Sequence, residues 1–143
     1  MNKTGIGWTD QSWNPVSGCK KISTGCAFCY ACAIAEPKRG TRAYPNGFDL
    51  TLRPHKLNEP KTEPGNQRIF VNSMSDLFWD KVPDDFRDQI LNVIELTPQH
   101  QFLVLTKRPD IMLTYSQRRP LPPNFWAGVS IENQRWATRL DIL

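Results

Sequence analysis

The chain has 143 residues, which fits one domain, and 39% of them are apolar, which is enough for a hydrophobic core. Lysine and arginine exceed aspartate and glutamate by 18 to 14, so the net charge of +4 permits a nucleic-acid partner without requiring one. The apolar runs are too short for a membrane span or a signal peptide, so we expect a cytoplasmic protein.

The N-terminal residues combine a short predicted strand with two tryptophans. Residues 9–16 include a stretch that can form a first strand running into a cysteine-rich loop. Trp8 and Trp13 lie among small polar residues. Two tryptophans this close are more often packed in a core or over a site than used to stack nucleic-acid bases. We therefore expect both to have a packing role.

All four cysteines lie in one run of the sequence, with the spacing Cys19-x6-Cys26-x2-Cys29-x2-Cys32. Thiols this close in sequence can ligate one metal centre, because short loops close at little entropic cost. Disulfides are typical of small secreted domains, and nothing in this sequence indicates secretion. Structural zinc sites usually pair two C-x2-C units across a longer gap, so the compact run favours an iron–sulfur cluster.

The spacing leaves two sets of ligands open. All four thiolates could close a site around one metal. Alternatively, Cys19, Cys26 and Cys29 could hold a four-iron cluster and leave one iron open to a substrate or cosubstrate. In the second case Cys32 is a small apolar residue on the following helix, and Phe28 shields the cluster from water.

After the cysteines the sequence predicts one helix and a long surface excursion. Residues 30–36, YACAIAE, are rich in alanine and favour a helix that ends before Pro37. Residues 38–67 are rich in proline and glycine, and only residues 48–52 alternate as a strand should. Five basic side chains make this excursion either a solvated loop or a contact surface for phosphates: Arg39, Arg42, Arg53, His55 and Lys56.

The rest of the chain alternates apolar strands with helices. Three short apolar runs that end in polar residues predict buried strands at residues 69–71, 102–105 and 126–129. Proline, aspartate or asparagine residues predict helix starts at positions 83–85, 109–110 and 133. This alternation predicts a single α/β domain with a parallel sheet and helices outside it.

In parallel sheets of this kind the carboxyl ends of the strands form the active face. A cysteine loop between an early strand and a helix lies on that same face, so we expect one site there. The chain ends inside the last predicted helix, and four strands cannot close a barrel. We therefore expect this chain to be either the N-terminal part of a longer protein or a shortened relative that a protein partner or self-association completes. Either partner would cover the apolar stripe formed by Trp136, Leu140 and Leu143.

The segments WNPVSGCKKISTGCAFCYA, RIFVNSMSDLF, VLTKRP and FWAGVSIEN, in this order, resemble a family of uncharacterised phage and prophage proteins named for its three-cysteine motif. That family is similar to radical S-adenosylmethionine enzymes with a spore photoproduct lyase-like layout. The resemblance covers nearly the whole chain. It implies an α/β fold of the partial (β/α) barrel type, here truncated after about four strands, with a Pro/Gly-rich excursion at residues 38–67.

The resemblance implies a four-iron four-sulfur cluster on three cysteines, with S-adenosylmethionine chelating the open iron through its amino and carboxylate groups. Cys19, Cys26 and Cys29 match the three ligands, and Phe28 matches the aromatic residue that precedes the last of them. This sequence departs from the pattern between its first two cysteines, where it has six residues and radical enzymes usually have three.

The resemblance also implies a cosubstrate site at the strand ends. Ser73, Ser75 and Asp76 match a segment that meets the methionyl part of S-adenosylmethionine. Lys107 matches a strand-end lysine of the lyase-like enzymes, and Ser130 matches a polar strand end further round the sheet.

We therefore expect an iron–sulfur enzyme that cleaves S-adenosylmethionine reductively and abstracts hydrogen from an unknown substrate. The alternative is a non-catalytic zinc module, in which all four cysteines close a structural site on a basic nucleic-acid-binding domain. The polar strand ends favour the enzyme, because a structural zinc site has no need of them.

Overall fold

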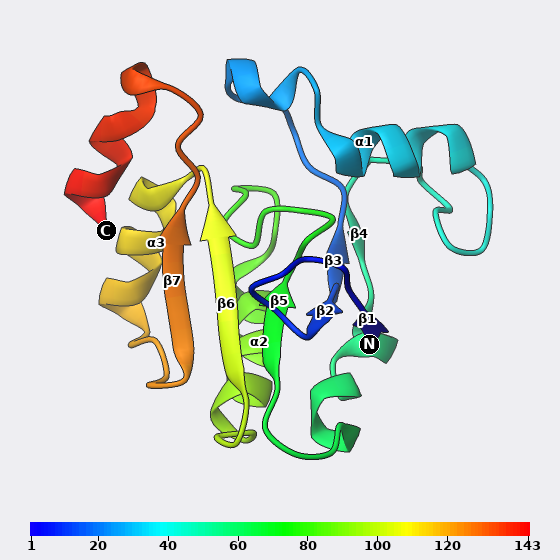
Figure 1. Ribbon diagram of the computed structural model, residues 1–143, viewed down its shortest axis with the longest axis vertical. Coiled ribbons are helices and arrows are strands. Elements are labelled where there is room, and N and C mark those ends of the chain that lie inside the picture. Colours follow the sequence, from blue (N-terminus) through cyan, green and yellow to red (C-terminus); the bar gives the residue numbers. More distant parts are fainter.

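A five-stranded sheet runs through the computed structural model, which describes residues 1–143 (Figure 1). In spatial order its strands are β1 (Asn2–Lys3), β2 (Gln11–Trp13), β5 (Arg68–Val71), β6 (Gln101–Thr106) and β7 (Phe125–Val129). The last four are mutually parallel, whereas β1 pairs antiparallel with β2 and was not expected. The strand expected within residues 9–16 and those expected at the three apolar runs are therefore present, in an open, mixed sheet.

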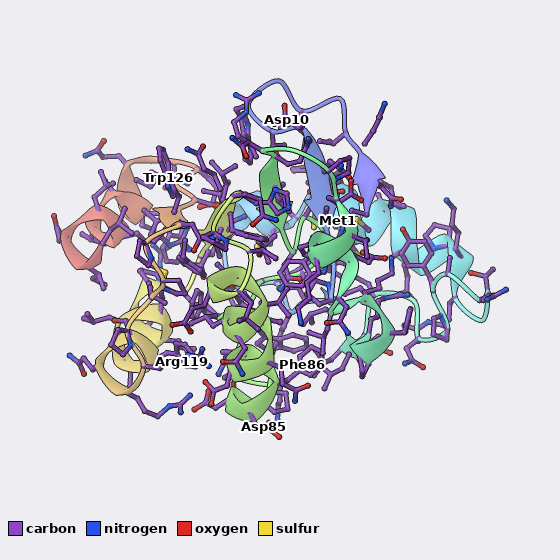
Figure 2. The ribbon with its side chains drawn as sticks, turned by 90° about the horizontal axis from the view of Figure 1, so that it is seen from below. Met1, Asp10, Asp85, Phe86, Arg119 and Trp126 are labelled. Carbon is purple, nitrogen blue, oxygen red and sulfur yellow. The ribbon has the colours of Figure 1, made fainter.

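Two helices follow the strands and begin where the sequence predicts. Helix α2 (Asp84–Glu95) starts directly after Pro83, with Asp84 and Asp85 in its first turn, where the helix dipole favours negative charge. Helix α3 (Pro109–Arg118) has its proline in the first turn, where no backbone donor is needed. Figure 2 shows both helices on one side of the sheet and the segment around Asp10 on the other.

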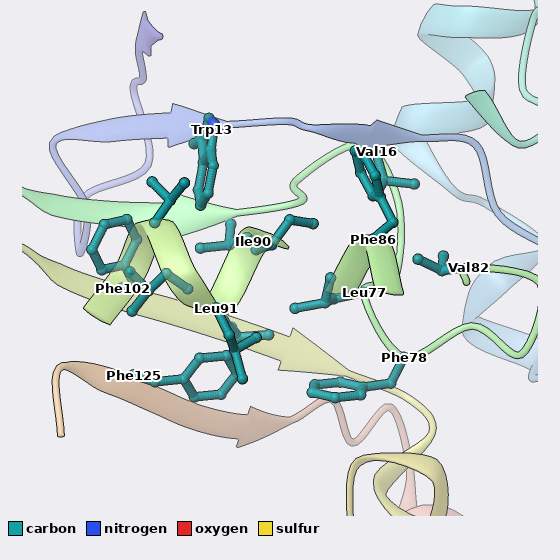
Figure 3. Packing of buried hydrophobic residues seen from close by; sticks show 14 of the residues in the cluster. Trp13, Val16, Leu77, Phe78, Val82, Phe86, Ile90, Leu91, Phe102 and Phe125 are labelled. Atoms are coloured by element: carbon teal, nitrogen blue, oxygen red, sulfur yellow. The ribbon is translucent and has the colours of Figure 1, made fainter. Parts of the chain in front are cut away.

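The main core fills the space between the sheet and α2 (Figure 3). Register brings Ile69 opposite Phe102 and Phe102 opposite Phe125, so neighbouring strands bury side chains on the same face. Trp13 meets Phe102 edge to face, with ring centroids 5.8 Å apart. Each fully buried side chain of this size contributes about 1.5–3 kcal/mol, and this core fixes the sheet on which the strand ends are placed.

The opposite face of the sheet is only partly covered. Trp8 packs edge to face on Phe70, with ring centroids 4.9 Å apart, so it covers part of this face while Trp13 lies in the core. Trp126 alternates with buried Phe125 and is 55% exposed. The packing roles expected for the two N-terminal tryptophans are therefore present, although Trp8 itself stays half-exposed.

The cysteine segment and the excursion form a separate layer beside the sheet. It contains a small sheet of β3 (Val16–Ser17) and β4 (Thr51–Leu52), helix α1 (Tyr30–Ala35), and the 3₁₀ turns η1 (Thr24–Cys26), η2 (Glu36–Lys38), η3 (Pro54–Lys56) and η4 (Glu59–Thr62). The strand expected over residues 48–52 is wrong at its start. Gly47 has φ of +56°, and Phe48 turns inward to pack on α1, so only Thr51–Leu52 pairs.

The last predicted helix is a 3₁₀ helix, η5 (Gln134–Ile142), rather than an α-helix. Asn133 caps it as expected, since its side chain accepts a hydrogen bond from Arg135 N at 3.1 Å. Leu140 and Leu143 are exposed, whereas Trp136 is partly covered by the guanidinium of Arg139, 4.3 Å from its ring centroid. No helix of the chain combines the length and the apolarity that crossing a membrane requires.

Candidate functional site

A cavity of about 320 Å³ is lined by the cysteine loop and by residues at the ends of the strands. In Figure 1 the cysteine loop lies at the end of the sheet to which the strand arrows point. The cavity brings together segments far apart in the sequence. All eight residues predicted for the site line it, three from the cysteine loop and five from the strand ends: Cys19, Cys26, Cys29, Ser73, Ser75, Asp76, Lys107 and Ser130. The carboxyl ends of parallel strands meet at one edge, and this explains the convergence.

Gly18 fixes the cysteine loop to the strand-end segment after β5. Its backbone forms an isolated parallel bridge with Ser75, and its N–H donates to Met74 O at 3.0 Å. Gly18 has φ of +89°, and a Cβ atom on it would clash with the carbonyl of Asp49. Only glycine adopts this positive φ without strain and also avoids the clash, so this position determines where Cys19 enters the cavity.

Asp76 organises the strand ends rather than pointing freely into the cavity. Its Oδ1 accepts hydrogen bonds from Thr106 Oγ1 at 2.8 Å and from Phe78 N at 3.0 Å. Its Oδ2 accepts from Lys107 N at 3.0 Å and from Arg108 Nη1 at 2.9 Å. Four donors satisfy the buried carboxylate, so Asp76 holds the ends of β5 and β6 together.

Arg108 links this network to the first cysteine. Its Nη1 lies 3.6 Å from Cys19 Sγ, and its Nη2 donates to Lys20 O at 2.9 Å. Burial raises the pKa of the Cys19 thiol above its ordinary value, and the positive charge of Arg108 opposes this rise only in part. A cation beside a buried sulfur favours its thiolate form, so Arg108 is placed to support Cys19 as a ligand.

Cys26 has a different environment, built by Glu132 after β7. Ser23 Oγ lies 3.4 Å from Cys26 Sγ and donates to Glu132 Oε1 at 2.6 Å. Glu132 also pairs with Lys107 at 3.3 Å and with Arg139 at 2.9 Å. Burial raises the pKa of Cys26, but hydrogen bonding from Ser23 and the charge of Lys107 outweigh it and leave that pKa below its ordinary value.

The two serines after β5 are held by neighbouring backbone and side-chain groups. Ser73 Oγ exchanges hydrogen bonds with the side chain of Asn14, at 3.1 and 3.2 Å, and Ser73 O accepts from the Tyr30 hydroxyl. Ser75 Oγ donates to Val16 O at 3.0 Å. These bonds fix the segment that forms one wall of the cavity.

Asn72 is a cavity residue that the sequence analysis did not single out. It is only 4% exposed and has φ of +60°, a left-handed conformation that asparagine tolerates better than most residues. Its Oδ1 accepts from Val16 N at 3.3 Å, but its buried Nδ2 has no hydrogen-bond partner. A buried donor without an acceptor is costly, so this amide is an unsatisfied group in a residue that lines the cavity.

Phe28 and Cys32 lie outside the cavity. The ring of Phe28 is 96% exposed, so it does not shield the three cysteines in this structure as the sequence suggested. Cys32 faces a shallow hollow next to Phe28, and Cys29 contributes to both that hollow and the cavity. All four cysteines are free thiols.

Three of the four cysteines lie around one cavity as free thiols. No three cysteine, histidine, aspartate or glutamate side chains converge tightly enough to hold one metal ion. A four-iron cluster spans several ångströms and takes its thiolates from separate positions around it. Three free thiols around one cavity, with Arg108 beside one and Lys107 acting on another, fit such a cluster.

The fold and the cavity define an α/β protein that carries a cysteine-lined site at the carboxyl edge of its parallel strands. The chain belongs to the family described as "Protein of unknown function (DUF5131)", whose model matches residues 3–143. No curated protein and no solved structure matches the chain. The family description names no activity, so the function is argued from the geometry.

Proposed function

We propose that the protein is a radical S-adenosylmethionine enzyme. Cys19, Cys26 and Cys29 would hold a four-iron four-sulfur cluster, and the strand ends around them would bind S-adenosylmethionine. The open sheet would then be a partial (β/α) barrel. The observation that carries the proposal is the single cavity, which is lined by the three cysteines and by every strand-end residue that the sequence pointed to.

When bound, the two cofactors would supply one-electron reduction and hydrogen abstraction from a substrate; the protein supplies the binding site. Arg108 stabilises negative charge on the Cys19 sulfur, and the charge of Lys107 does the same for Cys26. Asn72 and Lys107 line the same cavity, and Lys107 with its partner Glu132, 3.3 Å away, places a positive and a negative charge beside each other. These groups suit the amino-acid end of S-adenosylmethionine.

Asp76 acts in this proposal as a positioning residue. Its four hydrogen bonds leave no free acceptor for a ligand, but they hold Arg108 against Cys19 and Lys107 at the cavity wall. The other strand-end residues, Ser73, Ser75 and Ser130, contribute to the wall that the cosubstrate would contact.

Anaerobic reconstitution with iron and sulfide tests the cluster directly. We expect the purified chain to bind both and to develop the broad visible absorbance of a four-iron cluster. Cys19→Ser, Cys26→Ser and Cys29→Ser should each remove most of the iron, because each thiol lines the cavity. Cys32→Ser is the matched control, since it removes an equally short-spaced thiol that lies outside the cavity, and its iron content should stay at the level of the unmodified chain.

The zinc module gives the opposite pattern. Stoichiometric zinc without iron, or equal metal loss in all four variants, would mean that four thiolates close a structural site. Calorimetric titration of the reconstituted protein with S-adenosylmethionine tests the second half of the proposal, and unchanged affinity in Lys107→Gln together with Asn72→Ala would remove the strand ends from the cosubstrate site.

A further inference from the structure

A second cavity, of about 430 Å³, lies beside the small sheet β3–β4. Met74 lines it, whereas the flanking Ser73 and Ser75 line the cysteine cavity, so one strand-end turn separates the two. Its polar lining comes mainly from the basic excursion and includes Asn14, Arg42, Tyr44, Arg53, His55 and Lys56.

The two arginines that line this cavity, Arg42 and Arg53, form no ion pair. None of the residues that line the cavity is aspartate or glutamate. Lys56 does pair with Glu59 at 3.3 Å, but Glu59 also faces the N-terminal amine of Met1 at 3.4 Å. Arg39, from the same excursion, is by contrast neutralised outside the cavity by acidic partners. The structure thus concentrates unpaired positive charge at one place.

Arg53 is held in position without losing its charge. Its Nε donates to Ser17 Oγ at 3.1 Å and its Nη2 donates to Ala43 O at 2.6 Å, and both acceptors are neutral. Its Nη1 has no acceptor within the chain. A guanidinium fixed by neutral groups is preorganised to bind an oxyanion, because its planar fork matches the oxygens of phosphate.

The cavity is larger than one phosphate group requires. The rings of Tyr44 and His55 line it together with the arginines. Aromatic rings stack on nucleobases and so can hold the base of a nucleotide. Cations for a phosphate and rings for a base therefore lie in one cavity, an arrangement that suits a nucleotide.

We propose that this basic cavity binds the phosphate of a nucleotide, either free or as a unit of a single strand. Arg42 and Arg53 contact the phosphate, and Tyr44 and His55 contact the base. The site is distinct from the cysteine cavity and needs neither iron nor S-adenosylmethionine. Its nucleotide binding can therefore be tested independently of the proposed enzyme function.

Isothermal titration calorimetry of the full chain at low salt tests the site with three probes: inorganic phosphate, a nucleoside monophosphate and a short single-stranded oligonucleotide. We expect the two nucleotide probes to bind more tightly than phosphate. Arg42→Gln and Arg53→Gln should each weaken them on the order of tenfold to a hundredfold, the range for loss of a charged hydrogen bond. Arg42 makes no side-chain bond in the chain, so its variant should fold as the unmodified protein does.

Lys61→Gln is the matched control, because it removes the same charge from the same excursion but does not line the cavity. Its affinities should stay unchanged. Equal weakening in Lys61→Gln would identify nonspecific attraction to a basic chain and overturn the proposal. Equal binding of inorganic phosphate and nucleotides, or no binding of either nucleotide probe, would overturn it as well. The ratio between monophosphate and oligonucleotide then distinguishes a free nucleotide from a strand.

Discussion

Replacing Asp76 with asparagine tests the network on which the candidate site is built. Asp76 and Arg108 form an ion pair at 2.9 Å with both side chains only 8% exposed. Asparagine keeps the shape but removes the charge and turns one acceptor into a donor. Removing one partner of a buried pair costs about 3–5 kcal/mol, because the other charge stays buried and unpaired. At roughly 3–5 °C per kcal/mol for a chain of this size, the melting temperature should fall by about 10–20 °C.

The assay is urea or thermal denaturation followed by circular dichroism. Asp10→Asn is the matched control, because its pair with Arg68 has the same 2.9 Å distance but side chains that are 39% and 49% exposed. Such exposed pairs contribute less than about 1 kcal/mol. If Asp76→Asn costs no more than Asp10→Asn, the carboxylate does not organise the strand ends, and the argument that it positions Arg108 fails.

Two further substitutions test the backbone where the cysteine loop begins and the dependence of the free energy of unfolding on acidic pH. Gly18→Ala combines positive φ with a clash against the carbonyl of Asp49, and we expect it to lower the free energy of unfolding by roughly 2–3 kcal/mol. Gly65→Ala shares the positive φ without the clash, so it should lower the free energy of unfolding by about half as much. Equal losses in the two variants would refute the packing argument. A hydrogen bond from Arg118 holds the pKa of Asp88 below its ordinary value, although burial opposes this. The stabilisation by Asp88 is therefore complete above about pH 4 and disappears as the pH falls through its folded-state pKa. Asp88→Asn should lower the urea midpoint at pH 7 by the equivalent of less than about 1 kcal/mol, and this loss should shrink as the pH is lowered below about 4. A loss that stays constant down to the lowest pH at which the protein is folded would contradict this.

The sequence predicted the parts of the fold that depend on local pattern. Short apolar runs bounded by polar residues favour buried strands because they are too short for a buried helix, and proline with acidic residues marks the helix starts. The convergence of the predicted residues on one cavity also followed, since polar residues after parallel strands share one edge of the sheet. The sequence did not predict that η5 is a 3₁₀ helix, because the spacing of its apolar residues is compatible with an α-helix as well.

The residues that the sequence did not predict act through partners distant in the chain. Arg108 and Glu132 each follow a strand, but their roles depend on Cys19 and Ser23, which are brought close only by the fold. His100 is fully buried, and its Nδ1 accepts a hydrogen bond from Gln67 N at 3.2 Å, a contact that no local sequence pattern indicates.

The pairing of β2 with β5 has a consequence for the order in which the protein folds. Gln11 lies opposite Ile69, so a long loop must close before this pair forms, whereas β5, β6 and β7 join through single helices. We expect the unit of residues 68–129 to assemble first and the N-terminal segment to dock onto it later. Hydrogen exchange should then show faster opening in β2 than in β6. The cysteines lie on the late-docking segment, so their cavity should open and close with that segment while the rest of the sheet stays folded.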